Sequence, residues 1–457
     1  MSTLESIVHT EIPLPKGGFV LILNTGSVIS AESEAMLQAL HSRSIGGIKS
    51  HLKVLEAKGS DNFMANFYVG YGHKSIGDCG TCTIFIEGVS MLAAKAVQDS
   101  PLYSGQEAST RYIDFAKQNF IDPVGDKDKK KSKLTKDILE SWRAFYLKGL
   151  GVLQADLQKR FPRGENENEK IYTKAINARA FDIMRGFLPS GASTNFAWHT
   201  NFRQAADHLM KLRHHPLAEV RELADTIETA LKKAYPSSFG HPRFETTETF
   251  NKKWMEKMYY YTAKSPVDFK LSKNNIDRKS LAVFKKNLSA RKPKTEIPKE
   301  IAECGSLQFE FLLDFGSFRD VHRHRAVNQR MPLITMKHGF EEWYLNELPA
   351  DFRAEAKKFI AEQKKKITAL KASKEEAQYY IPMGYKLPNK ITGPLNALVY
   401  LAELRATRFV HFTLRKRAQQ IANTLAKEFK KEGLVIHLDS DPDRFDIKRG
   451  EHDIVQK

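Results

Sequence analysis

Residues 104–112, Ser-Gly-Gln-Glu-Ala-Ser-Thr-Arg-Tyr, carry side chains suited to holding a nucleotide. In this short polar segment, Ser109 and Arg111 supply a hydroxyl, a planar cation and backbone amides. Arginine suits phosphate because its planar fork makes two charge-assisted hydrogen bonds at once. The carboxylate of Glu107 can accept hydrogen bonds from ribose hydroxyls or hold an arginine. The segment therefore indicates a site for a phosphate and a sugar.

A second segment, Arg323-His324-Arg325, lies far along the chain and offers alternating cations that could straddle a bound diphosphate. Taken alone, the run is also typical of a solvated basic turn or of a nucleic-acid contact. In the same way, Ser109 could be a helix cap, and Glu107 and Arg111 could form a surface ion pair. These alternatives stay open for each segment by itself.

Together the two segments resemble the signature of the flavin-dependent thymidylate synthases, R-H-R-x-x-S-x-N-E-x-S-x-R-Y, which is one continuous run in that family. The N-terminal copy matches from Ser104 onward but has Asp-Ser-Pro at 99–101 in place of Arg-His-Arg. The C-terminal copy keeps Arg-His-Arg and then departs from the signature at Asn328, Arg330, Met331, Leu333, Thr335 and Met336. Because the losses are complementary, we predict a duplicated domain whose two copies build one composite site.

Further segments resemble other parts of the family. Gly-His-Lys-Ser at 72–75 is similar to the G-H-x-S of the flavin and folate site, and Thr-Asn-x-Arg at 200–203 is similar to a T-x-N-x-R in the flavin site. Arg-Gly-Phe-Leu-Pro at 185–189 is similar to the R-x-x-L-P whose arginine reaches the substrate. Leu-Arg at 212–213 and at 414–415 is similar to a Leu-Arg pair late in the family's sequence. Two positions depart from the family. Asp78-Cys79 stand where it has Glu-His, and Asp320 stands where it has glutamine.

The resemblance implies roles for individual residues. The substrate set is Glu107, Ser109, Arg111, Arg185 and Arg415; the cofactor set is His73, Asn201, Arg323, His324 and Arg325. Ser109 and Arg323 would form the catalytic set, with Ser109 positioning the substrate rather than acting as a nucleophile. Arg213 belongs to the copy that has lost Arg-His-Arg, so its site is expected to be vestigial.

The same resemblance implies an α+β fold of two tandem modules, each with helices packed on a small, mostly antiparallel sheet. We place the modules at residues 1–240 and 301–457, with a connecting segment at 241–300. The family forms homotetramers with active sites between subunits. Two copies of this fused chain would therefore form a homodimer that imitates the tetramer.

The implied reaction is the reductive methylation of dUMP to dTMP. Methylenetetrahydrofolate would donate the carbon, NADPH would reduce FAD, and the reduced flavin would pass a hydride to the product. The alternatives are flavin-dependent modification of another pyrimidine, possibly within a polynucleotide, and a non-catalytic remnant that binds nucleic acid.

Composition sets the outer bounds. A chain of 457 residues suits two domains, and a hydrophobic content of 41% with 28 Phe is ample for folded cores. The net charge of +18 favours polyanionic partners. The lysines cluster, however, in segments that resemble solvated faces (residues 127–133, 285–299 and 357–371), so nucleic acid is possible but is not the favoured partner.

The cysteines and the chain start carry weaker signals. Three cysteines, Cys79, Cys82 and Cys304, argue against a disulfide framework. Cys79-x-x-Cys82 could be half of a zinc site with His73, but a lone pair favours structural thiols, and we expect no metal. The polar start of the chain does not resemble a signal peptide, and no run of eighteen apolar residues occurs, so we expect a cytoplasmic protein.

Apolar spacing gives a coarse list of elements. We expect strands at 19–24 and 81–90, a helix at 31–56 that Gly46-Gly47 may divide, and a helix ending near Val97. Further helices are expected at 138–157, 179–188, 201–231, 351–372 and 394–430, the last as one helix or two. Residues 126–133 are expected to form a charged loop, residues 236–300 lose periodicity, and residues 305–312 are ambiguous between strand and helix.

Overall fold

The computed structural model describes residues 9–23, 29–41, 47–70, 72–108 and 113–439. The fold is α+β, as expected, with helices and two small antiparallel sheets. The chain forms two compact units that interleave in sequence. Unit 1 comprises residues 1–109, 119–121 and 192–259, and unit 2 comprises the rest. The modules drawn from sequence at 1–240 and 301–457 remain a prediction about duplication, because these units follow packing instead.

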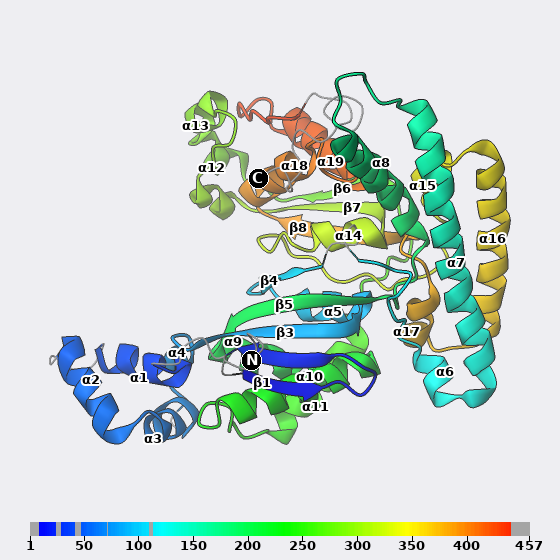
Figure 1. Ribbon diagram of the computed structural model, residues 1–457. Coiled ribbons are helices and arrows are strands. Elements are labelled where there is room, and N and C mark those ends of the chain that lie inside the picture. The colour runs from blue at the N-terminus through cyan, green and yellow to red at the C-terminus, as the bar shows by residue number, and fades with distance from the viewer. Residues whose placement is uncertain (1–8, 24–28, 42–46, 71, 109–112, 440–457) are drawn as a thin grey trace. The chain divides into compact units, whose positions relative to one another are not determined.

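Unit 1 is built on a five-stranded sheet in the order β1-β2-β3-β5-β4. Its strands are β1 (His9–Pro13), β2 (Phe19–Leu23), β3 (Thr81–Ser90), β4 (Ser104–Glu107) and β5 (Ser193–Asn201), and all neighbours are antiparallel. Its helices are α1 (Ala31–His41), α2 (Gly47–Lys58), α3 (Asp61–Phe63), the π-helix η1 (Met64–Gly70), α4 (Lys74–Gly77), α5 (Met91–Gln98), α9 (Phe202–Leu212), α10 (Ala218–Ala234) and α11 (Glu245–Met258). Helix α10 covers β1 and β2 (Figure 1).

Unit 2 contains a three-stranded sheet in the order β6-β7-β8. Its strands are β6 (Phe269–Asn274), β7 (Leu307–Asp314) and β8 (Lys386–Gly393). Its helices are α6 (Pro123–Lys127), α7 (Lys129–Arg160), α8 (Glu169–Met184), the 3-10 helix η2 (Arg185–Phe187), α12 (Arg278–Ala282), α13 (Lys285–Ala290), the 3-10 helix η3 (Lys299–Cys304), α14 (Phe315–Val321), α15 (Glu342–Asn346), α16 (Ala350–Ala369), α17 (Lys374–Ala377), the 3-10 helix η4 (Gln378–Tyr380), α18 (Leu395–Arg405) and α19 (Phe412–Glu428).

Aromatic packing explains why residues 122–191 belong to unit 2 rather than unit 1. The long helices α7 and α16 run side by side (Figure 1). The ring of Phe145 on α7 stacks on Phe352 and Phe359 of α16, with centroids 5.0 and 4.4 Å apart. Stacked rings of this size bury large apolar areas. The helix pair therefore joins segments that lie two hundred residues apart in the sequence.

Several expected elements need correction. Residues 126–133 are not a loop: α6 ends at Lys127 and α7 begins at Lys129, because Asp128 caps α7 by accepting from Lys130 N. Residues 236–300 contain α11, α12, α13 and strand β6, which pairs with β7. Residues 305–312 resolve as strand β7 from Leu307 onward. The strand at 81–90 and the helix at 351–372 are confirmed, the latter as α16.

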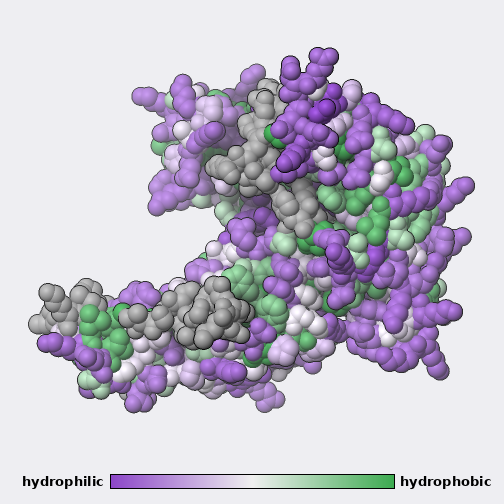
Figure 2. All heavy atoms as spheres, viewed as in Figure 1, coloured by the Kyte–Doolittle hydropathy of each residue, from purple (hydrophilic) through white to green (hydrophobic). Residues whose placement is uncertain are grey.

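The lysine-rich segment 285–299 lies at the surface of unit 2. Lys285, Lys286, Lys292, Lys294 and Lys299 are all exposed. The region of α12 and α13 accordingly shows a mostly hydrophilic face (Figure 2). This agrees with the interpretation of that cluster as a solvated face.

Two stretches of the chain repeat the same order of elements. Strand β3 leads into α5 and strand β7 leads into α14, with Ser90 and Asp314 as the helix caps. Later, η2, β5 and α9 follow one another as η4, β8 and α18 do. Arg185 to Gln378 and Phe202 to Leu395 are each 193 residues apart. The constant spacing supports the duplication predicted from the motif halves.

The two loops that follow η2 and η4 pair with each other inside unit 2. Leu188-Pro189 in the first loop corresponds to Ile381-Pro382 in the second at the same 193-residue spacing. The backbone hydrogen bonds are reciprocal: Ser190 N to Ile381 O (2.9 Å) with Met383 N to Leu188 O (2.8 Å), and Gly191 N to Tyr379 O (2.9 Å) with Gly384 N to Gly186 O (2.8 Å). Equivalent residues exchange equivalent bonds, which is the pattern of a twofold axis.

Candidate functional site

Arg185, the expected substrate arginine, lies half-buried at the start of η2 in unit 2. Its Nη2 donates a 3.1 Å hydrogen bond to Ser317 Oγ on α14. Its Nε is buried and has no hydrogen-bond partner among the residues that the structure describes. A Cβ at Gly316 would meet Arg185 Nε at an ordinary 3.5 Å but would crowd a carboxylate oxygen of Asp314 at 3.1 Å. The first half of the sequence thus supplies an arginine to an element of the second half.

A buried network fixes the hydrogen-bond direction at Arg185. Asp314 can only accept, so the 2.7 Å contact with Thr413 Oγ1 uses the threonine proton. The 2.6 Å contact between Ser317 Oγ and Thr413 Oγ1 then uses the serine proton. Ser317 Oγ is left as an acceptor, which is what the Arg185 donor requires. Tyr344 also donates to Asp314, at 2.8 Å, so the carboxylate is well satisfied.

Four arginines surround one carboxylate in this part of unit 2. We call Arg185, Arg319, Arg323 and Arg405, together with Asp320, the arginine group. Arg323 Nε lies 3.5 Å from Asp320 Oδ1. Burial alone would raise the pKa of Asp320, but Arg405, Arg323, Arg185 and Arg319 outweigh burial and lower it. Asp182 and Asp314 also act on Arg185, so four guanidinium charges face three carboxylates. The group keeps a net positive charge suited to an anionic ligand, and Asp320 is balanced by its neighbours rather than isolated.

His324 is neutral, which corrects the expectation that Arg323, His324 and Arg325 are alternating cations. Burial and the charge of Arg405 lower the pKa of His324 to about 3. Arg405 Nε donates a 2.8 Å hydrogen bond to His324 Nε2. Arg325, by contrast, is exposed. The Arg-His-Arg run thus presents two cations and one neutral ring.

Arg415 does not occupy the position equivalent to Arg213. Arg213 lies at the C-terminal end of α9, whereas Arg415 lies inside α19, where its Nε donates to Ala406 O at 3.1 Å. The residue at the matching end of α18 is Arg405. At the 193-residue spacing Leu212 aligns with Arg405 and Arg213 with Ala406, so Arg405 lies one residue from the position equivalent to Arg213. The role of Arg415 as a substrate residue stays a prediction.

The N-terminal motif half lies in unit 1 and is only partly described. The Glu107 carboxylate lies 2.5 Å from Lys95 Nζ and accepts from Gln98 Nε2 at 3.2 Å, and the side chains of Glu107 and Lys95 are 1% and 0% exposed. Its role as a ribose acceptor therefore stays a prediction, because the carboxylate already holds a buried cation. Ser109 and Arg111 lie outside the described residues.

The expected flavin residues of unit 1 have different surroundings. His73 is exposed at the start of α4. Asn201 caps α9, with its Oδ1 accepting from Gln204 N at 2.8 Å. Arg203 Nε lies 2.7 Å from Asp78 Oδ1. The aspartate that replaces the family's glutamate therefore forms an ion pair with the arginine of the segment that resembles T-x-N-x-R. The helix cap is a structural role that Asn201 would hold alongside any ligand contact.

Arg213 is enclosed by acidic partners. Its guanidinium makes a forked contact with Glu248, with Nε to Oε2 at 2.8 Å, and Nη1 lies 3.6 Å from Glu228. His214 Nε2 also contacts Glu248, at 2.6 Å. Glu248 already holds the fork of this arginine, while Glu228 is shared with Lys232 and Arg243.

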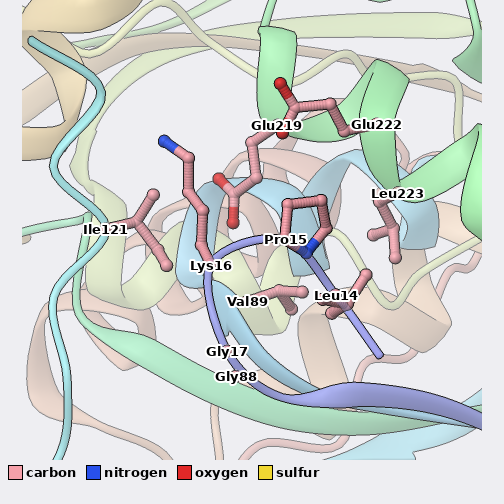
Figure 3. A pocket seen from close by; sticks show the side chains of 10 residues that line it. All are labelled: Leu14, Pro15, Lys16, Gly17, Gly88, Val89, Ile121, Glu219, Glu222 and Leu223. Carbon is pink, nitrogen blue, oxygen red and sulfur yellow. The ribbon is translucent and has the colours of Figure 1, made fainter. Parts of the chain in front are cut away.

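A small pocket of unit 1 lies between the β1–β2 turn and α10, lined by Leu14, Glu219 and Leu223 among others (Figure 3). Its volume of about 20 Å³ is roughly that of one ordered water. The pocket is too small for a nucleotide or a flavin. Glu219 on its rim already accepts from Ser90 N and Ser90 Oγ, at 2.7 and 2.6 Å.

The cysteine pair shows no sign of metal chemistry in the described part of the chain, where no three His, Cys, Asp or Glu side chains gather as metal ligands. Cys82 is buried, which raises the pKa of its thiol to about 12. Cys79 is half-buried, and its Sγ contacts Ser75 O at 3.6 Å. Across the same described residues, no helix is long and apolar enough to cross a bilayer.

Residues 28–237 match the family described as thymidylate synthase complementing protein. The match covers 210 of the 457 residues, and this segment of the chain is similar to that family. The resemblance to flavin-dependent thymidylate synthases is thereby confirmed.

Full-length relatives extend over both halves of the chain. A UPF0159 protein of Chlamydia muridarum (strain MoPn / Nigg) is 26% identical over 460 residues, covering 85% of each chain. A second, of Chlamydia pneumoniae, is 25% identical, covering 79% of this chain and 78% of its own. A third, of Thermoplasma acidophilum, is 22% identical, covering 80% and 86%. These alignments are compatible with a two-module layout.

Within the thymidylate synthase complementing family pattern, sequence reasoning missed three residues of this site. Arg319 and Arg405 gave no signal as motif members, although Leu404-Arg405 ends an apolar helix as Leu212-Arg213 does. Gln378 occupies the R-x-x-L-P arginine position of the second copy. It is fully buried, with Oε1 accepting from Ile334 N at 3.1 Å and Nε2 donating to Tyr260 at 3.1 Å. The spacing of Gln378 before Ile381-Pro382 could have revealed it.

Proposed function

We propose that this protein is an FAD-dependent thymidylate synthase that methylates dUMP to dTMP with methylenetetrahydrofolate and NADPH. The arginine group would be the anion-binding part of its single composite site. Similarity to the family over residues 28–237 supports thymidylate synthase-like chemistry. The specific substrate and cofactors are our inference from the residues.

One observation carries the proposal. Arg185 comes from the first motif set and Arg323 from the second, yet both act on Asp320 within the same compact unit. Their counterparts in the other copy, Gln378 and Asp99, carry no positive charge. At these two positions each copy carries a cation where the other has none, which is the pattern expected for one composite site per chain.

The residues present suit phosphate-bearing ligands. The buried, unpartnered Nε of Arg185 and the surplus charge around Asp320 are features that a nucleotide phosphate would satisfy. FAD, when bound, would supply the hydride chemistry that protein side chains cannot perform. The residues proposed to hold it are His73, Asn201, Arg323, His324 and Arg325.

The remaining roles concern orientation. Ser317 would hold Arg185 in one direction, so that its fork meets the nucleotide without losing rotamer entropy on binding. Asp320 would keep Arg323 and Arg405 from repelling each other before the ligand arrives. Glu107, Ser109 and Arg111 would complete the nucleotide contacts, with Ser109 positioning the substrate. Two chains would pair as a homodimer.

The proposal is tested by purifying the protein and identifying what it carries and does. We expect a yellow protein that releases FAD, rather than FMN, on denaturation. We also expect release of tritium from 5-tritiated dUMP that requires both methylenetetrahydrofolate and NADPH. A protein that cannot be reconstituted with FAD would refute the enzyme; one that holds FAD but ignores dUMP would favour another pyrimidine.

A further inference from the structure

His324 is held in a defined orientation on a short turn. Its backbone N donates to Val321 O at 3.0 Å, which closes the turn after α14. Gln329 Nε2 donates to the same carbonyl, at 2.6 Å, and ties the following segment to it. The imidazole is 7% exposed, and the ring of Tyr400 meets it edge-on with centroids 6.0 Å apart. The ring therefore has little freedom to rotate or flip.

Arg405 determines which nitrogen of His324 carries the proton. A guanidinium Nε–H is always a donor and never an acceptor. His324 Nε2, 2.8 Å from Arg405 Nε, must therefore accept and cannot carry hydrogen. In a neutral imidazole the proton then lies on Nδ1. No hydrogen bond of Nδ1 occurs within residues 113–439, so this donor is available to a ligand.

We infer that Arg405 is a positioning residue that locks His324 as the Nδ1–H tautomer, so that His324 offers one neutral donor to a ring carbonyl of the bound ligand. The cyclic imide carbonyl is common to a pyrimidine nucleotide and to the flavin ring. The neutral donor suits that uncharged acceptor, while Arg323 and Arg185 suit phosphate. The identity of the ligand rests on the proposed function; the tautomer does not.

The groups facing His324 support a permanently neutral ring. Arg405 and burial both disfavour a proton on Nε2, and Asp320 is the one nearby group that favours it. Asp320 is itself engaged by the other arginines. The tautomer should therefore persist across the pH range in which the protein is folded.

The first experiment measures the tautomer in ligand-free protein labelled with ¹³C-histidine. The ring carbon shifts distinguish the two tautomers, and the His324→Asn variant identifies the signal. We expect wild-type His324 as Nδ1–H, without titration between pH 8 and 5. In Arg405→Met the signal should move toward a tautomer mixture that titrates. Arg405→Gln serves if Arg405→Met does not fold, and the exposed Arg243→Met is the matched control. An Nε2–H tautomer in the wild type would overturn the lock.

The second experiment asks whether the donor is used. Asparagine can place a donor where Nδ1–H lies, whereas aspartate of the same shape cannot. Binding of FAD and of dUMP is measured separately for His324→Asn and His324→Asp. We expect His324→Asn to bind near wild type and His324→Asp to bind whichever ligand is contacted roughly tenfold more weakly. Equal binding by the two variants would overturn the donor role. If the wild type binds neither ligand, both the donor role and the proposed function are refuted, while the tautomer result stands.

Discussion

The C-terminal ends of α9 and α18 are equivalent by repeat, and each carries an arginine with opposite surroundings. Arg213 makes a forked ion pair with Glu248 and lies near Glu228, which also pairs with Lys232 and Arg243. Arg405 meets Asp320 but shares that carboxylate with other arginines, so the local charge stays positive. An arginine at a ligand-binding position is therefore not evidence of a site by itself. What matters is whether a carboxylate already holds its guanidinium fork, as Glu248 holds Arg213.

The same contrast separates the two R-x-x-L-P positions. Arg185 keeps a buried donor without a partner, whereas Gln378 satisfies both ends of its amide with protein groups. An unsatisfied buried donor costs about 1–3 kcal/mol, a cost that a ligand can remove. A satisfied amide gains nothing from a ligand. Arg185 thus keeps a donor that a ligand can use, whereas the amide of Gln378 is used in packing within the protein.

The largest expected effect follows from removing Arg185. Arg185→Ala should reduce dUMP affinity or turnover by roughly tenfold or more, the scale of a charge-assisted contact of about 1.5–3 kcal/mol. Steady-state kinetics and calorimetric titration with dUMP measure it, with thermal unfolding as the check on folding. Unchanged kinetics in a folded variant would remove Arg185 from the site.

Arg213→Ala should instead lower stability while leaving kinetics near wild type. The variant leaves Glu248 without its forked partner, at a cost of about 1.5–3 kcal/mol, while Glu228 keeps Lys232 and Arg243. Chemical denaturation measures the free energy of unfolding, and the tritium-release assay measures activity. A loss of kcat/KM as large as that of Arg185→Ala, with normal stability, would contradict the comparison and the model of one site per chain.

Asp320→Asn tests the charge balance of the arginine group. Removing the one carboxylate should strengthen binding of inorganic phosphate by roughly twofold to fivefold at low salt, because the surplus positive charge increases. The gain should shrink at high salt, and the protein should be less stable because the arginines repel. Titration with phosphate at two ionic strengths measures the effect. Weaker phosphate binding would mean that Asp320 orients the arginines rather than offsetting them.

The last effect concerns the pH dependence of the free energy of unfolding, through the Glu248 carboxylate that Arg213 contacts. The hydrogen bond from Arg213 lowers the pKa of Glu248 from 4.5 to about 2. A depressed carboxyl pKa stabilises the fold above the unfolded value and loses that contribution as pH falls toward the folded value. The stability difference between wild type and Glu248→Gln should therefore be constant above about pH 5 and shrink below about 4.5. Denaturation curves at pH 6, 5, 4 and 3.5 measure it; a difference that grows on acidification would have the wrong sign.

Much of this was predictable from sequence because it depends on local pattern. The alternation of apolar residues located strand β3, and the complementary motif halves predicted a duplication that the 193-residue spacing of elements supports. Arg323 lies nine residues after the cap Asp314, as Asp99 lies nine after Ser90, so the structure keeps the alignment of the two motif halves. Spacing of this kind survives in sequence because helix caps fix where each segment begins.

The failures share a physical cause. Arg405 was missed because nothing local tells which of two helices a degenerate Leu-Arg pair ends. The neutral state of His324 depends on Arg405, a partner eighty-one residues away that no spacing rule connects to it. The buried ion pair of Glu107 with Lys95 is likewise a product of folding. Contacts between residues that come together only in the folded chain cannot be predicted from local sequence patterns.

The reciprocal hydrogen bonds between the loops at 186–191 and 379–384 should not weaken when the protein is diluted. In a pair of separate identical subunits, such a contact would weaken as the protein concentration falls. Here both loops belong to one chain, so the effective concentration of each for the other is fixed by the covalent connection. The contact also no longer has to be made by two copies of one sequence. Each loop was therefore free to change alone, which is how an arginine and a glutamine came to stand at equivalent ends of the same pairing.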